Sequence, residues 1–397
     1  MPVAEQKTKN PLNIKLQCEK TKRGENQFTF LGALGLSTLE QLPDIHPTTI
    51  LPKIKVGGNG KKDGLLQIQS RRYLGNKFKL LSFIEKIVKE HCGEYKSFCD
   101  IFAGTGVVGS KFNDDSKKII SNELLYSNYV SLYAWLAPGQ FDKTKISEYI
   151  HMLNNICLNG DNYASRHFGG AYFTMENAKK IGVIREKIEE LDLNLKERAI
   201  LLTSLLYAID KVANTCGHYD AFRRTLDTTA PIKLLIPDIK QERNWQNEIY
   251  REDANKLIRR ITTDILYVDP PYNSRHYCDS YHLLENIATW KKPKVFGIAK
   301  KMLRDDLKSQ YCLKTAARAF DDLISNANCR YILVSYNNMA EKGNQRSNAR
   351  IKDAEIVRIL SKKGKTEIFE TNFKSFTTGK SAIEGHTERI FYCKVAT

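Results

Sequence analysis

The sequence predicts an α/β protein with a doubly wound, largely parallel sheet that is interrupted by a mainly helical insertion. Short apolar runs of strand type recur along the chain, and the first of them enters a glycine-rich turn. Between the early and the late strands lies a long stretch of helical periodicity. A strand, a glycine turn, a helix and a second strand are the usual opening of a doubly wound sheet.

The first 64 residues form a basic extension with no assignable function. They are rich in lysine near the start, and an apolar patch at 28–42 has the composition of a short helix. The glycine- and lysine-rich run at 57–64 is typical of a flexible linker. We therefore expect the compact domain to begin near Leu65.

Residues 65–140 carry the first elements of the sheet. Apolar residues recur at helical spacing over 79–90. The run 97–102 predicts a strand that leads into the turn at 104–109, and a second strand is expected at 118–121.

Residues 141–240 have a different pattern, with three predicted helices at 145–158, 176–191 and 195–214. Strand patterns resume at 265–268 and 331–334, and the alternating run at 388–395 predicts a late strand. The sequence thus predicts one catalytic domain made of 65–140 and 241–397, with 141–240 inserted into it.

Composition narrows the class of protein. The 397 residues are 42% hydrophobic and 27% charged, which is typical of a globular chain. The net charge of +17 favours a polyanionic partner. No apolar run reaches the roughly 20 residues that span a bilayer, and the polar start lacks a signal core, so we expect a cytoplasmic protein without a membrane partner. Nine cysteines without a C-x-x-C pair predict free thiols and no metal site.

The turn from Gly104 to Gly109 matches the pattern G-x-G-x-x-G. Glycines allow a tight turn after a strand and the close approach of a ligand. Glu123, at the end of the next strand, is placed to accept hydrogen bonds from ribose hydroxyls. Both NAD-binding and S-adenosylmethionine-binding folds use this arrangement, so the turn alone leaves a dehydrogenase open.

A second motif, Asp269-Pro270-Pro271-Tyr272, directly follows the strand at 265–268. Two prolines stiffen the loop and remove two backbone donors, which leaves carbonyl oxygens to accept. The carboxyl end of a strand is also where ligands bind in open α/β sheets. The loop therefore predicts a rigid site with a carboxylate, a carbonyl and an aromatic ring.

These motifs resemble those of the N6-adenine DNA methyltransferases. The loop resembles their catalytic motif, 102–106 resembles their cofactor motif, and Arg72-Tyr73-Leu74-Gly75-Asn76-Lys77 resembles their N-terminal cofactor motif. The order of the motifs, with a long insertion, is similar to the alpha group or D12 class, to which Dam-like enzymes of restriction–modification systems belong. The resemblance covers about residues 70–395 and implies a class I methyltransferase fold with S-adenosylmethionine as cofactor.

The resemblance implies roles for individual residues. The residues implied to bind the cofactor are Tyr73, Lys77, Phe102, Gly104, Gly106, Glu123, Asp253 and Asp269. The residues implied to act in catalysis are Asp269, Pro270, Pro271 and Tyr272. The chain departs from the commonest pattern in having Tyr73 where tryptophan is usual and Asn76 where a second glycine is usual.

The chemistry of the loop fits this activity. The lone pair of adenine N6 is delocalised into the ring, so acceptors must hold the N6 hydrogens and orient the nitrogen toward the methyl donor. Asp269 and the Pro270 carbonyl supply acceptors, and Tyr272 offers a face on which a flipped base can stack.

The insertion is expected to read the target sequence on double-stranded DNA. Arginine can pair with guanine or with phosphate. The candidates for contact with nucleic acid are Arg166, Arg223 and Arg224 in the insertion, and Arg275 and His276 after the catalytic loop. A cluster of lysines at 291–304 follows. We expect a monomer or weak dimer, and a cognate restriction endonuclease is a candidate partner.

Four alternatives are weaker. An NAD-dependent dehydrogenase leaves the Asp269 loop and the net charge unexplained. A methyltransferase for RNA or for guanine N2 shares the loop but usually lacks the upstream motif and the insertion. Cytosine C5 methylation needs a thiolate after a proline, and no proline here is followed by cysteine. A non-enzymatic DNA-binding protein would not need both motifs.

Overall fold

The computed structural model describes residues 49–50, 64–227, 230–337, 349–372 and 387–396. Most of the 1–64 extension, including the helix expected at 28–42, lies outside these residues. Of the extension, residues 49–50 and 64 are described, and the first two form β1 (Thr49–Ile50), which pairs in parallel with β9 at one edge of the sheet.

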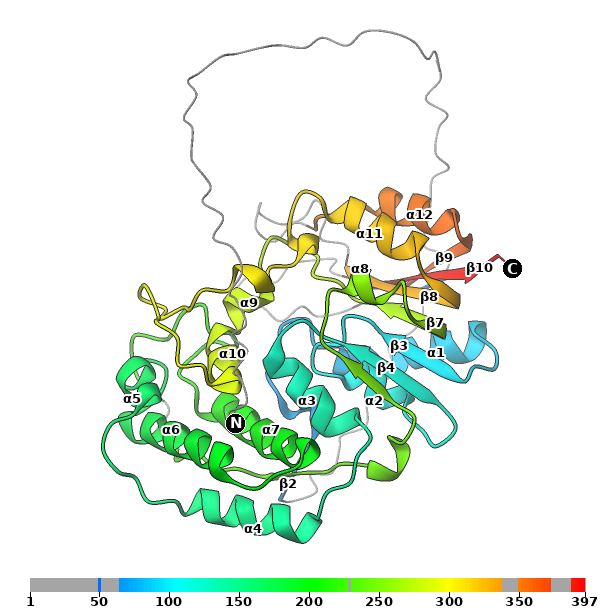
Figure 1. Ribbon diagram of the computed structural model, residues 1–397. Helices are drawn as coiled ribbons and strands as arrows, with labels where there is room; N and C mark the ends of the chain where they lie inside the picture. The colour runs from blue at the N-terminus through cyan, green and yellow to red at the C-terminus, as the bar shows by residue number, and fades with distance from the viewer. Residues whose placement is uncertain (1–48, 51–63, 228–229, 338–348, 373–386, 397) are drawn as a thin grey trace, which may run out of the picture. The chain divides into compact units, whose positions relative to one another are not determined.

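The centre of the fold is an eight-stranded sheet in the order β1-β9-β10-β8-β7-β3-β4-β6 (Figure 1). Neighbouring strands from β8 to β6 run parallel, whereas β10 is antiparallel to both β8 and β9. The bounds are β3 (Ser97–Asp100), β4 (Lys118–Asn122), β6 (Glu248–Tyr250), β7 (Thr262–Val268), β8 (Asn328–Asn337), β9 (Gly364–Asn372) and β10 (Thr387–Val395). A short pair, β2 (Leu65–Leu66) with β5 (Ile236–Pro237), lies apart from this sheet.

The predicted doubly wound sheet is confirmed. From β3 the chain adds β4 and β6 on one side, and then β7 and β8 on the other, so the winding reverses between β3 and β7. A ligand cleft is expected at the carboxyl ends of the strands at such a switch point. The strand runs expected at 97–102, 118–121, 265–268, 331–334 and 388–395 correspond to β3, β4, β7, β8 and β10.

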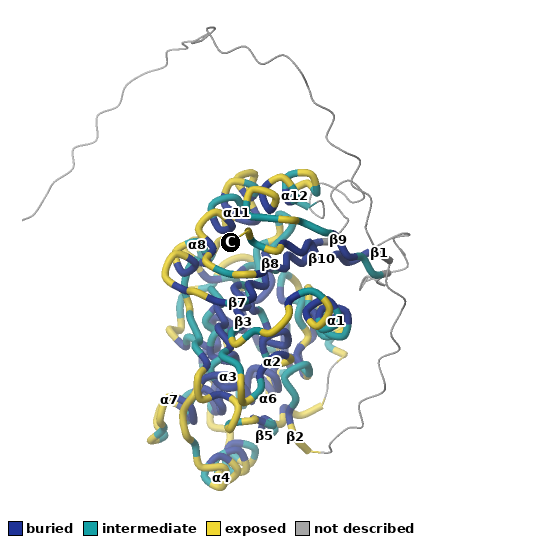
Figure 2. The backbone as a smooth tube through the Cα atoms, turned by 90° about the vertical axis from the view of Figure 1, so that its right-hand side faces the viewer, coloured by how far each residue is buried: buried dark blue, intermediate teal, exposed yellow. Residues whose placement is uncertain are grey.

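Helices cover both faces of the sheet, and the strands β3, β7, β8 and β10 are mostly dark in the burial view (Figure 2). On one face α1 (Leu81–His91) and α2 (Val107–Phe112) share a core with Phe98, Tyr267 and Leu333. On the other face lie α8 (Ala254–Leu257), α11 (Ala316–Ser325) and α12 (Asp353–Ser361). Successive strand residues alternate between the two cores, as the pleat requires.

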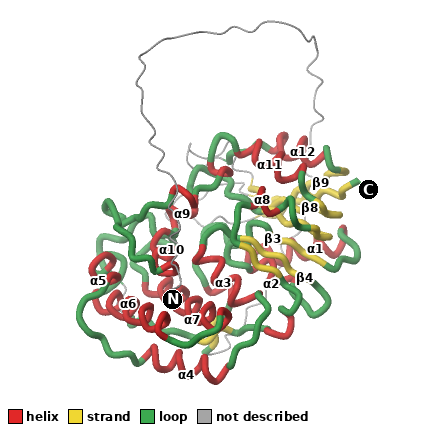
Figure 3. Tube along the Cα trace, in the orientation of Figure 1, coloured by secondary structure: helices red, strands yellow, loops and turns green. Residues whose placement is uncertain are grey.

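A second group of helices gathers at one side of the sheet (Figure 3). The three helices predicted in the insertion are α4 (Lys143–Asn154), α6 (Met175–Glu190) and α7 (Leu195–Val212). The sequence reading did not identify α3 (Tyr126–Leu136) or the short α5 (Tyr163–Phe168). All of them share one apolar core, to which α10 (His282–Thr289) also contributes.

The buried Arg185 links α6 to α10. Its guanidinium donates to the carbonyls of Ile287 (2.8 Å) and Ala288 (3.1 Å) at the C-terminal end of α10. These carbonyls have no partner within their own helix, so the arginine satisfies acceptors that burial would otherwise leave open. The helices of 141–240 are thus held against the segment that follows the catalytic loop.

The segments that connect these elements include one more short α-helix and several 3₁₀ turns. Their bounds are α9 (Tyr277–Ser280), η1 (Ile68–Ser70), η2 (Lys77–Leu80), η3 (Gln241–Arg243), η4 (Asp305–Leu307) and η5 (Gln310–Cys312). None of the helices in the described ranges has both the length and the apolar character needed to cross a bilayer. The cysteines in those ranges are free thiols, as expected.

Candidate functional site

A cleft that is open to solvent lies at the carboxyl ends of β3, β4 and β7. It is the place where the topology predicts a ligand. The predicted site residues that line it are Tyr73, Lys77, Phe102, Gly104, Glu123, Asp253, Asp269 and Pro271. Residues more than 190 positions apart in the sequence are therefore brought to one cavity.

The glycine turn contributes Gly104 to the lining of the cleft. Gly104 and Gly106 have positive φ angles of 53° and 81°, which side-chain-bearing residues rarely adopt. A Cβ on Gly104 would lie 3.3 Å from the Tyr73 ring, and one on Gly106 would lie 2.6 Å from Leu132. Gly106 does not line the cleft itself, but its conformation lets the chain turn from β3 into α2.

Glu123 is tied to the glycine turn by hydrogen bonds. One carboxylate oxygen accepts from the Gly104 amide (3.0 Å), and the other accepts from the amides of Leu124 (2.9 Å) and Leu125 (3.2 Å). Burial raises the pKa of Glu123 to about 7, although these amides act to lower it. The carboxylate is fixed and faces the cleft, so it can accept from a further hydroxyl donor.

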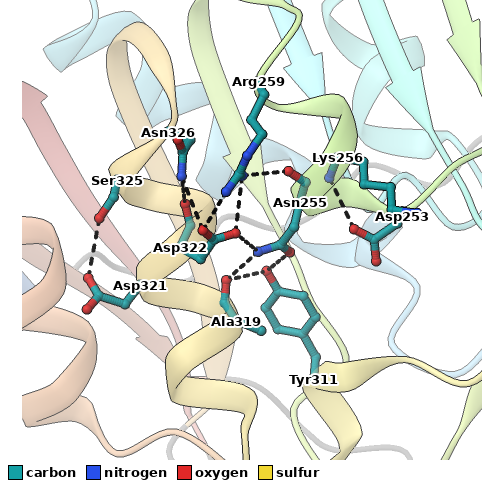
Figure 4. Close-up of polar contacts among 10 residues, drawn as sticks. All are labelled: Asp253, Asn255, Lys256, Arg259, Tyr311, Ala319, Asp321, Asp322, Ser325 and Asn326. Atoms are coloured by element: carbon teal, nitrogen blue, oxygen red, sulfur yellow. Dashed lines mark hydrogen bonds and ion pairs between the residues drawn. The ribbon is translucent and has the colours of Figure 1, made fainter.

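Asp253 and Tyr311 both line the cleft, and each is held by polar contacts with residues of α8 (Figure 4). Asp253 caps α8 by accepting from the Lys256 amide (3.1 Å). Asn255 accepts from the Tyr311 hydroxyl (2.9 Å) and donates to Asp322 on α11 (2.8 Å). This network fixes the Tyr311 ring edge-on to Phe102, with the ring centres 5.0 Å apart.

Tyr73 is held in a stack of three tyrosines. Its ring centre lies 5.3 Å from that of Tyr277 and 4.5 Å from that of Tyr281. Its hydroxyl accepts from the Asn128 amide group (2.9 Å), and the Tyr281 hydroxyl accepts from the Leu74 amide (2.7 Å). The aromatic residue of the N-terminal motif therefore has a fixed orientation in the cleft.

The buried Arg71 fixes the beginning of the same segment. It donates to Asn128 (2.7 Å) and lies 3.4 Å from the Asp210 carboxylate on α7. Arg72 also bonds to the Asp210 backbone carbonyl. The segment 71–77 is thereby attached to the helices of the insertion as well as to the sheet.

Lys77 and Asp269 form the central charge pair of the cleft. The Lys77 ammonium lies 3.0 Å from an Asp269 oxygen and donates to the Gly75 carbonyl (3.2 Å). The two side chains are only 5% and 16% exposed. Burial raises the pKa of Asp269 to about 6, an effect that Lys77 partly offsets. Burial acts to lower the pKa of Lys77, but nearby carboxylates keep it well above its usual value.

The rest of the loop 269–272 is held by hydrogen bonds to its backbone. The Tyr272 carbonyl accepts from the Arg350 amide (2.7 Å) and from the Tyr336 hydroxyl (3.3 Å). The Tyr272 ring lies edge-on to Tyr336 and 5.8 Å from the Lys77 ammonium. Pro270 is buried and Pro271 lines the cleft. The loop holds its aromatic ring at the side of the Lys77–Asp269 pair.

Asp100, at the end of β3, is a cleft residue that sequence reasoning missed. It is 1% exposed, and its Oδ1 has no hydrogen-bond partner. Burial raises its pKa well above the usual range, as do the nearby Asp269 and Glu123. An acid four residues before the glycine turn was a signal that the sequence offered. The spacing of Tyr277 and Tyr281 was a second signal, because residues four apart lie on the same face of a helix.

The predicted nucleic-acid residues lie outside the cleft lining. Arg166, Arg223, Arg224 and Arg275 are exposed, and His276 is half-buried. Burial lowers the pKa of His167, and the positive charges of Arg166 and Lys300 lower it further. Burial also lowers the pKa of His218, an effect that Asp220 opposes and that Arg275 and Lys301 reinforce. Lys301 pairs with Asp220 (2.7 Å), so the segment 141–240 and the lysine-rich segment 291–304 lie near one another.

Comparison with known proteins identifies the family. Residues 73–348 match the family model for D12 class N6 adenine-specific DNA methyltransferase. The chain is 34% identical to the type II methyltransferase M.NlaIII of Neisseria lactamica, over 79% of this chain and 95% of that protein. It is 34% identical to M.FokI of Planomicrobium okeanokoites, over 81% of this chain, and 37% identical to the modification methylase StsI of Streptococcus sanguinis, over 67%. The chain spans about half the length of M.FokI and of StsI, with 52% and 44% covered.

Replacing Lys77 with methionine is expected to destabilise the protein more at pH 8 than at pH 5. Without the ammonium, the pKa of the buried Asp269 rises further above its unfolded value of about 3.9, so stability falls as the pH rises through that range. The loss at pH 8 should be about 3 kcal/mol, measured by urea unfolding at both pH values. The double variant K77M/D269N should lose most of this pH dependence, and an equal loss at both pH values would contradict the assignment.

Proposed function

Because the chain belongs to the D12 class N6 adenine-specific DNA methyltransferases, we propose that it transfers the methyl group of S-adenosylmethionine to adenine N6 in double-stranded DNA. The observation that carries the proposal is the position of Asp269. Its carboxylate lies at the cleft, bonded to Lys77, at the start of a loop whose other groups are fixed. A carboxylate, a proline carbonyl and an aromatic ring are what a weakly nucleophilic exocyclic amine needs for orientation.

The residues of the cleft fit the methyl donor. Glu123 offers fixed carboxylate oxygens to the ribose hydroxyls, and the glycine turn leaves room beside it. The unpartnered Oδ1 of Asp100 suits the ammonium of the donor's methionine moiety. Tyr73, Phe102 and Tyr311 supply aromatic surface, and Asp253 supplies an acceptor for an exocyclic amine. When bound, the donor supplies an electrophilic methyl group on sulfonium.

The target adenine would be held by the catalytic loop. The base must leave the duplex to reach the cleft, because N6 is otherwise inside the stack. Asp269 and the Pro270 carbonyl accept the two N6 hydrogens and direct the nitrogen lone pair into the cleft, while Tyr272 stacks on the ring. Lys77 keeps the carboxylate in place. Bound in the cleft, the donor would give its methyl group to N6 and leave as a thioether, and the proton that N6 loses would pass to solvent.

Target recognition is assigned to the helical segment 141–240, with Arg166, Arg223 and Arg224. Arg275 and His276 lie beside the catalytic loop and suit phosphate contact. Lys291, Lys294 and Lys300 of the segment 291–304 are exposed, and no ion pair involves them within the described ranges. Their charge suits the phosphate backbone, which dominates affinity for DNA.

The names of the relatives favour a role in restriction and modification. M.NlaIII and M.FokI are type II methyltransferases by name, and StsI is a modification methylase. We propose that the present chain likewise protects DNA against a cognate endonuclease and acts in the cytoplasm as a monomer or weak dimer.

The first test is methyl transfer from labelled S-adenosylmethionine to unmethylated genomic DNA and, in parallel, to total RNA. We expect label on DNA as N6-methyladenine. Asp269→Ala should lower the rate by roughly a hundredfold or more, because it removes an acceptor of the N6 hydrogens, while DNA binding is retained. Label on RNA alone would overturn the substrate, and no label on either would overturn the activity.

Affinity for S-adenosylmethionine should fall as the pH drops through about 7. This is the pKa to which burial raises Glu123, and only the ionised carboxylate offers all its lone pairs to the ribose. Glu123→Gln should weaken binding at pH 8 by roughly tenfold and flatten the pH dependence. Calorimetric titration between pH 6 and 8.5 measures both effects. A variant with the wild-type pH dependence would remove Glu123 from the ribose site.

Arg275→Ala is expected to weaken DNA binding similarly for all sequences and to reduce the salt dependence of the affinity by about one unit of slope. Fluorescence anisotropy at several salt concentrations measures this slope. Arg330→Ala is the matched control, because Arg330 is also exposed but lies near the start of β8, at the opposite edge of the sheet. Equal effects of the two variants would argue against a specific contact at Arg275.

A further inference from the structure

The turn 296–301 and the residues beside it expose apolar side chains to which the proposed reaction assigns no role. Ile298 is 86% exposed and Phe296 is 48% exposed, and Leu303, just beyond the turn, is 78% exposed. A single exposed apolar side chain is ordinary, but three within eight residues of one segment indicate a surface that a partner covers.

The turn has a fixed shape. A β-bridge joins its ends, with the Phe296 amide donating to the Lys301 carbonyl (2.8 Å) and the Lys301 amide donating to the Phe296 carbonyl (3.0 Å). Between them, the Ala299 carbonyl accepts from the buried Tyr172 hydroxyl (3.0 Å). Because the backbone is already ordered, little conformational entropy is lost when the turn is bound.

Hydrogen bonds and an ion pair tie the turn to the short helix that follows the catalytic loop. Lys301 pairs with Asp220 (2.7 Å), and Asp220 accepts from the Ser280 hydroxyl on α9 (3.2 Å). Downstream of the turn, residues 307–309 line the cleft. The exposed apolar side chains therefore belong to a segment that continues into the proposed methyl-transfer site.

The charge of the segment 291–304 indicates which partner covers these side chains. It contains no acidic residue, and its basic residues are Lys291, Lys292, Lys294, Lys300, Lys301 and Arg304. Lys294 and Lys300 are exposed on the two sides of Ile298. These charges suit phosphate, but an apolar side chain gains nothing from phosphate. The surface of a duplex that suits an apolar side chain is the base faces, which are reached between base steps.

We propose that Ile298 inserts between the bases of the DNA substrate, while the lysines around it bind the phosphates. Gly297 and Ala299 flank it with small side chains, so that one isoleucine forms a narrow tip. A Cβ on Gly297, which has a φ of 68°, would meet nothing within 4 Å. Insertion unstacks a base step and lowers the cost of turning the target adenine out of the duplex. The inference rests on the proposed function for the partner, but the shape of the turn does not.

The test compares Ile298→Ala with the wild-type full-length chain in DNA binding at several salt concentrations. The variant should bind roughly tenfold more weakly, because it loses apolar burial. The salt dependence of its affinity should be unchanged, because apolar burial releases no counterions. Lys300→Gln should instead reduce that dependence by about one unit of slope. Wild-type affinity in Ile298→Ala would overturn the contact.

The matched control is Leu195→Ala, which removes a comparable apolar side chain that is 73% exposed at the start of α7. It should leave both the affinity and its salt dependence at the wild-type values. An equal loss of affinity in the two variants would show a general effect of apolar surface and would contradict a specific role of Ile298.

A second measurement detects insertion itself and needs no methyl transfer. Permanganate oxidises thymines that have lost their stacking partners. Genomic DNA bound by the wild-type protein should carry such thymines at the bound sites, and fewer of them with Ile298→Ala. An unchanged pattern overturns insertion and leaves the proposed reaction unaffected. Oxidised thymines produced by a wild-type protein that methylates no DNA overturn the proposed reaction alone.

Discussion

The burial of Asp269 beside Lys77 is the constraint on which the rest of the site depends. A carboxylate that is 16% exposed needs a counter-charge, and among the described residues Lys77 of the segment 71–77 supplies it. That segment is fixed in turn by Arg71 on Asp210 and by the tyrosine stack. The charge pair and the contacts of segment 71–77 therefore join the sheet, the helices of 141–240 and α9–α10 around one cavity.

Much of the fold could be predicted because its signals are local. The apolar runs of β3, β4, β7, β8 and β10 and the periodicity of α1, α4, α6 and α7 each lie within a short window. The elements that the sequence did not predict have no such local signal. Helix α3 is apolar nearly all round, since it is packed between the sheet and the insertion, and so it shows little periodicity. Strand β6 has three residues, too few for alternation to be seen.

The site was predictable where chemistry is concentrated in a motif, as in the glycine turn and at Asp269–Tyr272. It was not predictable where a residue acquires its role through strand register. Glu388 appears as one acid in an alternating strand, and only the antiparallel insertion of β10 between β8 and β9 places it at the carboxyl end of β8. Asp100 and Tyr311 are similar cases, because only the folded chain brings these two residues to the cleft.

The position of β10 also bears on how the chain acquires its structure. This strand lies between β8 and β9 but follows both in the sequence, so neither can gain its final neighbour until residues 387–395 have left the ribosome. Until then, two strand edges with unpaired backbone groups are exposed, which is the condition under which sheets associate with other chains. The contacts that close the sheet join residues far apart in the sequence, such as Tyr392 with the carbonyl of His91. The sheet is thus expected to close late in folding, and folding is expected to be slow.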